Sequence, residues 1–155
     1  MAVKPIPKGY HALTPYLVVK GAAAALDFYA TAFGAKELLR MAGPSGRIGH
    51  AEMKIGDSPF MLADEHPEVG AVAPPPTGGH YVTFMVYVPD VDAVFKRAIA
   101  AGATEVRPVQ LQFYGDRAGV LRDPFGHEWM IATHVEDVPP GEIERRARES
   151  ARQVG

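Results

Sequence analysis

His50 and Glu52 stand two positions apart in the alternating segment 48–55, so on a β-strand their side chains share one face. A carboxylate in an apolar setting can act as a general base, because desolvation raises its pKa toward neutrality. The same pair could instead supply two ligands to a divalent metal ion. A third ligand would then come from His11, His80 or His134. The simplest alternative is a hydrogen bond between His50 and Glu52.

The segment 113–117 carries a second group of reactive side chains. Tyr114, Asp116 and Arg117 could form a clamp for an anion, or an acid–base pair. The simpler interpretation is an ion pair between Asp116 and Arg117 that orders the loop.

The elements that must position these residues are predicted to occur twice. Each half has the pattern of a strand, a helix with one apolar stripe, and three further strands. The expected strands cover residues 14–19, 35–41, 48–55 and 60–63, then 81–88, 104–109, 118–122 and 128–133. The expected helices cover residues 22–33 and 91–101, with Asp90 as the N-cap of the second.

These patterns predict an α+β domain over residues 1–135, built from modules at about 10–64 and 80–134. A proline-rich connector, 64–79, separates the modules. The polar tail, 136–155, is expected to be helical because Glu142 and Arg146 stand at i, i+4 spacing. One helix cannot cover both faces of a four-stranded sheet, so the other face must meet the partner module, another chain or a ligand. Two curved sheets would enclose a groove suited to a small molecule.

The composition excludes several classes of protein. The chain has 155 residues, and 16 basic against 18 acidic side chains give a net charge of −2, so no basic surplus indicates a nucleic acid or an anionic membrane as partner. There is no cysteine, which excludes disulfides, thiolate metal sites and cysteine nucleophiles. No apolar run is long enough to cross a bilayer, and no secretory signal is visible, so we expect a soluble cytoplasmic protein.

The duplicated βαβββ pattern, together with Leu26-Asp-Phe-Tyr29 and Asp123-Pro-Phe-Gly-His127, resembles the vicinal oxygen chelate superfamily. That superfamily includes glyoxalase I, extradiol dioxygenases and bleomycin-resistance proteins. The segment Gln112-Phe-Tyr-Gly-Asp-Arg117 is most similar to the PhnB-like branch. The resemblance covers about residues 10–135 and implies a glyoxalase/bleomycin-resistance-like fold with a concave groove. It does not imply one activity, since a fold hosts many functions.

The resemblance also implies where metal ligands would lie. In this chain the corresponding places fall on Thr14, Glu52, Thr83 and Met130. Only Glu52 is an ordinary ligand for a divalent cation, because a threonine hydroxyl and a thioether bind such ions poorly. We therefore expect no metal and no other cofactor, with Glu52 hydrogen-bonded to His50, Tyr16 or water instead.

Strand alternation from these places predicts the groove lining. The expected ligand-binding residues are Tyr16, Met85, Tyr87 and Met130, with Tyr114 and Arg117 from the loop and Glu52 as the catalytic candidate. Such a surface suits a flat or aromatic molecule, since methionine adapts its shape and tyrosine stacks. The alternative is that these residues pack against one another or a second chain. His127 and Trp129 have the opposite parity and are expected to be a structural histidine and a core residue.

Two functions follow as hypotheses. The first is a small-molecule-binding protein of the glyoxalase/bleomycin-resistance type with a mainly apolar or aromatic ligand. The second is an enzyme of the lyase, isomerase or dioxygenase type that uses Glu52 as a base or a shifted His50/Glu52 metal site. We expect a homodimer, because each module leaves a sheet face and an edge to cover. Glu52→Gln should abolish function, whereas His127→Asn should mainly lower stability.

Overall fold

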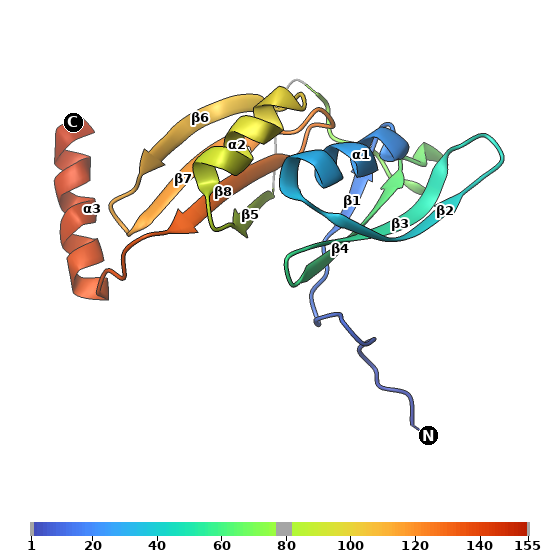
Figure 1. The fold of residues 1–155 in the computed structure, drawn as a ribbon, viewed down its shortest axis with the longest axis horizontal. Coiled ribbons are helices and arrows are strands. Elements are labelled where there is room, and N and C mark those ends of the chain that lie inside the picture. The colour runs from blue at the N-terminus through green and yellow to red at the C-terminus, as the bar shows by residue number, and fades with distance from the viewer. Residues whose placement is uncertain (1, 77–81, 155) are drawn as a thin grey trace. The chain divides into compact units, whose positions relative to one another are not determined.

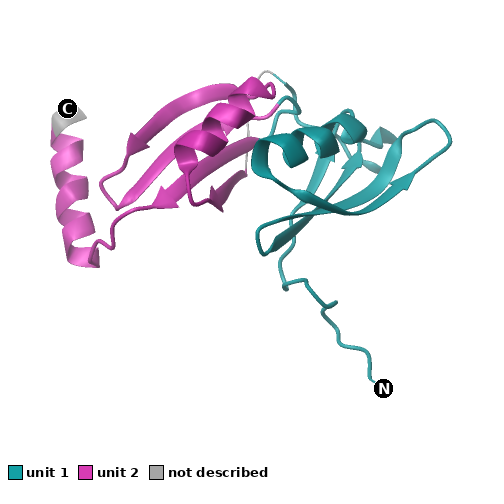
Figure 2. Cartoon of the chain, in the orientation of Figure 1, with its two compact units in different colours: residues 1–80, 124–127 teal, residues 81–123, 128–155 magenta. Residues whose placement is uncertain are grey.

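The computed structural model describes residues 2–76 and 82–154 and divides the chain into two compact units (Figures 1 and 2). Unit 1 comprises residues 1–80 and 124–127, and unit 2 comprises residues 81–123 and 128–155. Each unit contains one four-stranded sheet and one helix that packs on it, which confirms the predicted α+β class. His80, at the expected start of the second module, and residue 81, at the expected start of its first strand, lie outside the described residues.

Unit 1 contains the first half of the repeat. Its elements are β1 (Tyr16–Val19), α1 (Ala22–Phe33), β2 (Lys36–Ala42), β3 (Ile48–Ile55), β4 (Ser58–Asp64) and the 3-10 turn η1 (Pro67–Val69). The strand order is β1-β4-β3-β2, with β1 parallel to β4 and the other pairs antiparallel. The strand β1 begins two residues later than predicted, so Thr14 precedes it, and Pro15 has no N–H with which to extend the ladder.

Unit 2 repeats this topology. Its elements are β5 (Thr83–Tyr87), α2 (Val91–Ala100), β6 (Thr104–Leu111), β7 (Asp116–Arg122), β8 (Glu128–His134) and α3 (Pro140–Val154). The order β5-β8-β7-β6 is that of unit 1, again with one parallel pair. The strand β7 begins at Asp116, two residues before the predicted start, which brings Asp116 into the sheet. Among the described residues, no helix is long and apolar enough to span a membrane.

Each helix buries one face of its sheet, and the strands alternate accordingly. In unit 1, Leu17 of β1 and Met53 of β3 are buried, as are α1 residues such as Leu26 and Tyr29. In unit 2, the core includes Trp129, as predicted, and its indole N–H donates to Asp123 at 2.9 Å. Every second residue of these strands therefore points away from the helix, toward the face on which the candidate site lies.

A carboxylate at the end of β4 joins three segments of unit 1. Asp64 accepts hydrogen bonds from the backbone N–H groups of Gly21, Ala22 and Ile48 at 2.8–2.9 Å. It thereby caps α1, which has no side-chain cap of its own, and ties the start of β3 to it. In unit 2 the corresponding contact is made by Thr133, whose hydroxyl accepts from the Val91 N–H at 2.9 Å.

The turn between β7 and β8 belongs to unit 1. Phe125 lies against Phe28 and Tyr29, with ring centroids 6.1 and 6.2 Å apart. The His127 ring donates a hydrogen bond to the Val18 carbonyl of β1 at 2.9 Å. His127 is thus a hydrogen-bonded, structural histidine as predicted, and its partner is the backbone of β1.

Replacing Asp64 by alanine should destabilise the protein by about 2 kcal/mol, the upper end of the range for lost helix caps, because three N–H groups lose their acceptor. Burial acts to raise the pKa of Asp64, but the N–H groups of Ala22, Ile48 and Gly21 outweigh it and hold the pKa below its usual 3.8. The stabilisation is therefore present above that value and is lost as the pH falls through the lower folded-state pKa. Urea unfolding of both proteins at pH 7 and pH 3 measures the difference.

Asp27→Ala is the matched control, because Asp27 lies exposed on the same helix. It should change the free energy of unfolding by less than about 0.5 kcal/mol. Equal losses in the two variants would show that Asp64 does not hold α1 and β3 together.

Candidate functional site

Tyr16, His50 and Glu52 form a chain of hydrogen bonds on the face of the unit 1 sheet that α1 leaves uncovered. The Tyr16 hydroxyl lies 2.8 Å from His50 Nδ1, and His50 Nε2 lies 2.8 Å from Glu52 Oε2. Tyr16 is 50% exposed, whereas His50 and Glu52 are half-buried. The predicted hydrogen bond between Glu52 and His50 is confirmed, and Tyr16 extends it toward the surface.

The chemistry of the three groups sets the direction of the protons. A carboxylate can only accept hydrogen bonds, so His50 Nε2 carries the hydrogen that Glu52 accepts. In a neutral imidazole the other nitrogen is then an acceptor, and the Tyr16 hydroxyl donates to His50 Nδ1. The outer side of the Tyr16 oxygen is left with lone pairs only.

Apolar side chains surround this chain, and sequence reasoning missed them. Leu39 and Met41 of the edge strand β2 lie opposite Glu52 and His50, and both are exposed. Met61 of β4 lies opposite both Glu52 and Tyr16. A register count from the turn 56–57 would have found Met61, because the pairing runs without a break from Ile55 opposite Ser58 to Glu52 opposite Met61. The same count from the turn 43–46 fails for Leu39 and Met41, because a bulge between Met41 and Ala42 shifts the register.

The donor set does not fit the metal site that the resemblance implies. Thr14, Thr83 and Met130 are poor ligands, and the equivalent of Met130 in unit 1 is Met61, because each pairs with the first strand of its sheet at the same place. Both nitrogens of His50 take part in hydrogen bonds, which argues against the shifted His50/Glu52 site. Within the described ranges, no three His, Asp or Glu side chains come together as metal ligands.

Unit 2 carries a different network on its uncovered face. The Tyr87 hydroxyl donates to Asp116 Oδ2 at 2.9 Å, and His134 Nδ1 lies 2.8 Å from Asp116 Oδ1. His134 Nε2 in turn lies 2.7 Å from Asp137. The hydrogen bonds to Asp116 and then Asp137 raise the pKa of His134 above 6.5, and the hydrogen bond to Asp116 raises the pKa of Tyr87. The two carboxylates therefore favour the protonated form of His134.

The structure corrects the prediction for the segment 113–117. Asp116 and Arg117 do not pair, because adjacent strand residues point to opposite faces. Arg117 lies on the face that α2 covers and forms a two-pronged ion pair with Asp92, with both N–O distances at 2.8 Å. The proposed clamp of Tyr114, Asp116 and Arg117 over one face is therefore wrong. Tyr114 is half-buried, and desolvation followed by the charge of Asp116 raises its pKa.

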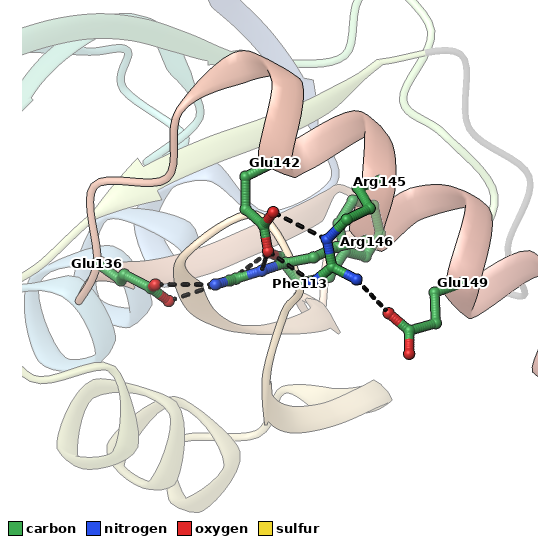
Figure 3. Close-up of polar contacts among 6 residues, drawn as sticks. All are labelled: Phe113, Glu136, Glu142, Arg145, Arg146 and Glu149. Atoms are coloured by element: carbon green, nitrogen blue, oxygen red, sulfur yellow. Dashed lines mark hydrogen bonds and ion pairs between the residues drawn. The ribbon is translucent and has the colours of Figure 1, made fainter.

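The tail fixes the loop that leads into Asp116. In Figure 3, Arg146 of α3 contacts Glu142, Glu136 and the Phe113 carbonyl, at 2.9–3.2 Å. The Gly115 carbonyl accepts from the N–H groups of residues 135 and 136. A side chain at Gly115, where φ is +101°, would overlap the Glu136 carbonyl oxygen. The helical tail is thus part of the support of the unit 2 network, and Arg145 followed by Arg146 lowers the pKa of Glu142 to about 2.

The hairpin turn after β7 would have predicted the contact between Asp116 and His134, which the sequence analysis missed. With Arg122 opposite Glu128, each step away from the turn keeps the pairing, and Asp116 arrives opposite His134. A register count from the turn 123–127 would have found this pair. The contact with Tyr87 depends on β5 and could not be found in that way.

Comparison with known proteins identifies the family. The model of the Glyoxalase/Bleomycin resistance protein/Dioxygenase superfamily matches residues 10–131. The chain belongs to this superfamily. The predicted membership is therefore confirmed, and with it the glyoxalase/bleomycin-resistance fold.

The chain is similar to both curated proteins and solved structures. Mb0911c of Mycobacterium bovis is 46% identical over 136 residues, which are 86% of this chain and 90% of that protein. The structure of TioX from Micromonospora sp. ML1 matches with a TM-score of 0.63 and 30% identity, over 81% of this chain and 99% of TioX. A PhnB protein from Bacillus cereus, at 19% identity and a TM-score of 0.62, covers 79% of this chain and 99% of its own and shares the fold.

In this superfamily member, the predicted site residues divide between the units. Tyr16 and Glu52 are brought together in unit 1, with His50 between them. Met85 and Met130 lie opposite each other in unit 2, next to Tyr87 on the same face, whereas Arg117 does not reach that face. Their roles as ligand-binding or catalytic residues stay predictions.

The raised pKa of His134 is directly measurable. An NMR pH titration of the His134 ring protons should give a value above 6.5, and Asp137→Asn should lower it because one of the two carboxylates is lost. Since the pKa is raised in the folded state, this stabilisation is complete below about 6.5 and is lost as the pH rises through the folded value. A His134 pKa that does not change in Asp137→Asn would contradict the geometry.

Proposed function

We propose that this protein binds a small, mainly apolar or aromatic molecule on the uncovered face of the unit 1 sheet. The observation that supports this most is the chain Tyr16–His50–Glu52, set among the exposed apolar residues of that face. Ligand sites typically combine apolar lining with a few well-placed polar groups that orient the ligand.

The direction of the hydrogen bonds narrows the ligand class. The Tyr16 proton is donated inward to His50, so the phenol oxygen can only accept from a ligand. We therefore propose a ligand with an O–H or N–H group on an aromatic or apolar skeleton. Leu39, Met41 and Met61 supply apolar contact, and methionine adapts to ligands of different shape.

The superfamily description includes bleomycin resistance proteins. Membership therefore supports a binding role, because such a protein can act by binding its ligand without changing it chemically. Oxygenases and glyoxalases stand in the same description, so membership alone does not choose between binding and catalysis. The cytoplasmic location stays a prediction from the sequence.

The same three residues favour proton transfer as a second candidate function. Tyr16 could take a proton from an acidic group of the substrate while it passes its own proton to His50 Nδ1, and Glu52 would stabilise the imidazolium that forms. The substrate keeps the electron pair of the broken bond, and return of the proton to another atom gives an isomerase. This hypothesis replaces Glu52 as the direct base, because Glu52 contacts His50.

The proposal is tested with 2-naphthol and its methyl ether, which has no hydroxyl proton. Methyl resonances of 13C-labelled methionine report the site: Met41 and Met61 should shift on binding, whereas the buried Met53 should not. Tyr16→Phe should weaken 2-naphthol binding about fivefold, the usual worth of one hydrogen bond, and leave the methyl ether unchanged. Glu52→Gln should also weaken it, because His50 loses the partner that orients it.

Tyr10→Phe is the matched control, because no group among the described residues hydrogen-bonds the Tyr10 hydroxyl. Its affinity should equal that of the wild type. Equal binding of 2-naphthol and its ether by wild-type protein, or shifts confined to other methionines, would show that Tyr16 does not orient a ligand.

We also propose a homodimer, as predicted from the sequence. Each unit leaves one sheet face uncovered, and the edge strand β2 exposes Leu38, Leu39 and Met41. Exposed apolar patches of this kind mark interaction sites. One chain has a mass of 16.7 kDa, and sedimentation equilibrium at micromolar concentration should give twice this mass. A mass of one chain under these conditions would refute the dimer.

A further inference from the structure

A buried carboxylate is the centre of the polar network in unit 2. Asp116 is only 3% exposed, and each of its oxygens meets one group, Tyr87 on one side and His134 on the other. The residue next to it, Arg117, is turned to the opposite face and is neutralised by Asp92. Among the residues that the structure describes, His134 is the one cationic side chain in contact with Asp116, and it is shared with Asp137.

The network makes Tyr87 an acceptor. Because a carboxylate cannot donate, the one proton of the phenol is committed to Asp116. Tyr87 is nevertheless 59% exposed, so its oxygen presents lone pairs to the outside. In unit 1 the group that meets the tyrosine hydroxyl is an imidazole nitrogen, but here it is a carboxylate that is already hydrogen-bonded to His134. Tyr87 can therefore orient a donor but cannot readily take its proton.

The charge around Tyr87 favours a cationic donor. Asp116 and Asp137 carry two negative charges, and His134 between them supplies at most one positive charge, so the cluster is negative in either protonation state of His134. The register places two arginines on the same face: Arg122 of β7, opposite Glu128, and Arg107 of the edge strand β6, opposite Val120. Measured between backbones, Arg107 is three strand spacings, about 14 Å, from β5, and Arg122 is four residues, about 13 Å, along β7 from Ala118, which lies level with Tyr87. Both backbone separations exceed the screening length of about 8–10 Å at moderate salt.

The side chains beside Tyr87 define a surface for an apolar skeleton. Ala132 pairs with Tyr87 on one side and with Ala118 on the other, and both alanines are buried. Because these side chains are small, the Tyr87 ring can extend over them to reach Asp116. Two residues before Tyr87, Met85 lies opposite Met130 and is exposed. Thioethers and an exposed phenol ring both contact aromatic and cationic groups well.

We propose that this face of unit 2 holds a second binding site, for a primary or secondary ammonium group carried on an aromatic or apolar skeleton. The ammonium N–H donates to Tyr87 Oη, the carboxylate pair of Asp116 and Asp137 supplies the negative field, and Met85 and Met130 contact the skeleton. The site takes a different ligand class from the one proposed for unit 1.

Three probes of one skeleton test the proposal: 2-phenylethylammonium, neutral 2-phenylethanol, and the quaternary phenethyltrimethylammonium, which has no N–H. The primary ammonium should bind most tightly, about tenfold better than the alcohol, since a charged donor forms the stronger hydrogen bond. It should shift the methyl signals of Met85 and Met130 and leave Met41, Met61 and Met53 unchanged. Higher salt should weaken its binding, and salt should have little effect on the alcohol.

Tyr87→Phe should abolish the preference for the primary over the quaternary ammonium, while the matched variant Tyr10→Phe retains it. Because Tyr87→Phe also leaves a buried oxygen of Asp116 without a donor, circular dichroism must show that the variant is folded, and the three-probe comparison on wild-type protein decides the question if it is not. Equal affinity for ammonium and alcohol, or shifts of Met41 and Met61 instead, would overturn the proposal. The second result would leave the unit 1 site intact, because 2-naphthol tests that site independently.

Discussion

Each sheet of this protein has four strands but only one helix to cover it, and this constraint determines where everything else lies. Strand side chains alternate between faces, so the helix takes the apolar set and the opposite set stays open. In both units, the hydrogen-bonded tyrosine, histidine and carboxylate side chains that could take part in chemistry lie on the open face. Arg117 lies on the other face: its position in the alternation of β7 turns it toward α2, where it forms an ion pair with Asp92.

The two units have the same strand topology and differ in the hydrogen-bond network on the open face of the sheet. In both units, a side chain near the end of one strand accepts a hydrogen bond from the first backbone N–H of the helix. This side chain is Asp64 of β4 in unit 1 and Thr133 of β8 in unit 2. In both, an exposed tyrosine donates inward. The partner is a histidine backed by a glutamate in one unit and a buried aspartate in the other, and we propose proton transfer for the first alone.

Superfamily membership describes the scaffold rather than the chemistry. The donor set at the positions that the resemblance assigns to metal ligands is mostly threonine and methionine, and Glu52 points to His50 instead. Both proposed sites follow from hydrogen-bond direction, which a family description does not contain. The tail is also more than an appendage, since Arg146 ties α3 to the loop that precedes Asp116 (Figure 3).

The sequence by itself determined the duplicated order of elements, the superfamily, the alternation of faces and the contact between His50 and Glu52, because these depend on spacing within one strand or one short segment. It placed Arg117 in a clamp and paired it with Asp116 because chain proximity was taken for spatial proximity. Only the tertiary structure decided the partners of the two tyrosines: Tyr16 meets a residue 34 positions away and Tyr87 one 29 positions away. Those contacts depend on the register between strands, which local pattern does not specify.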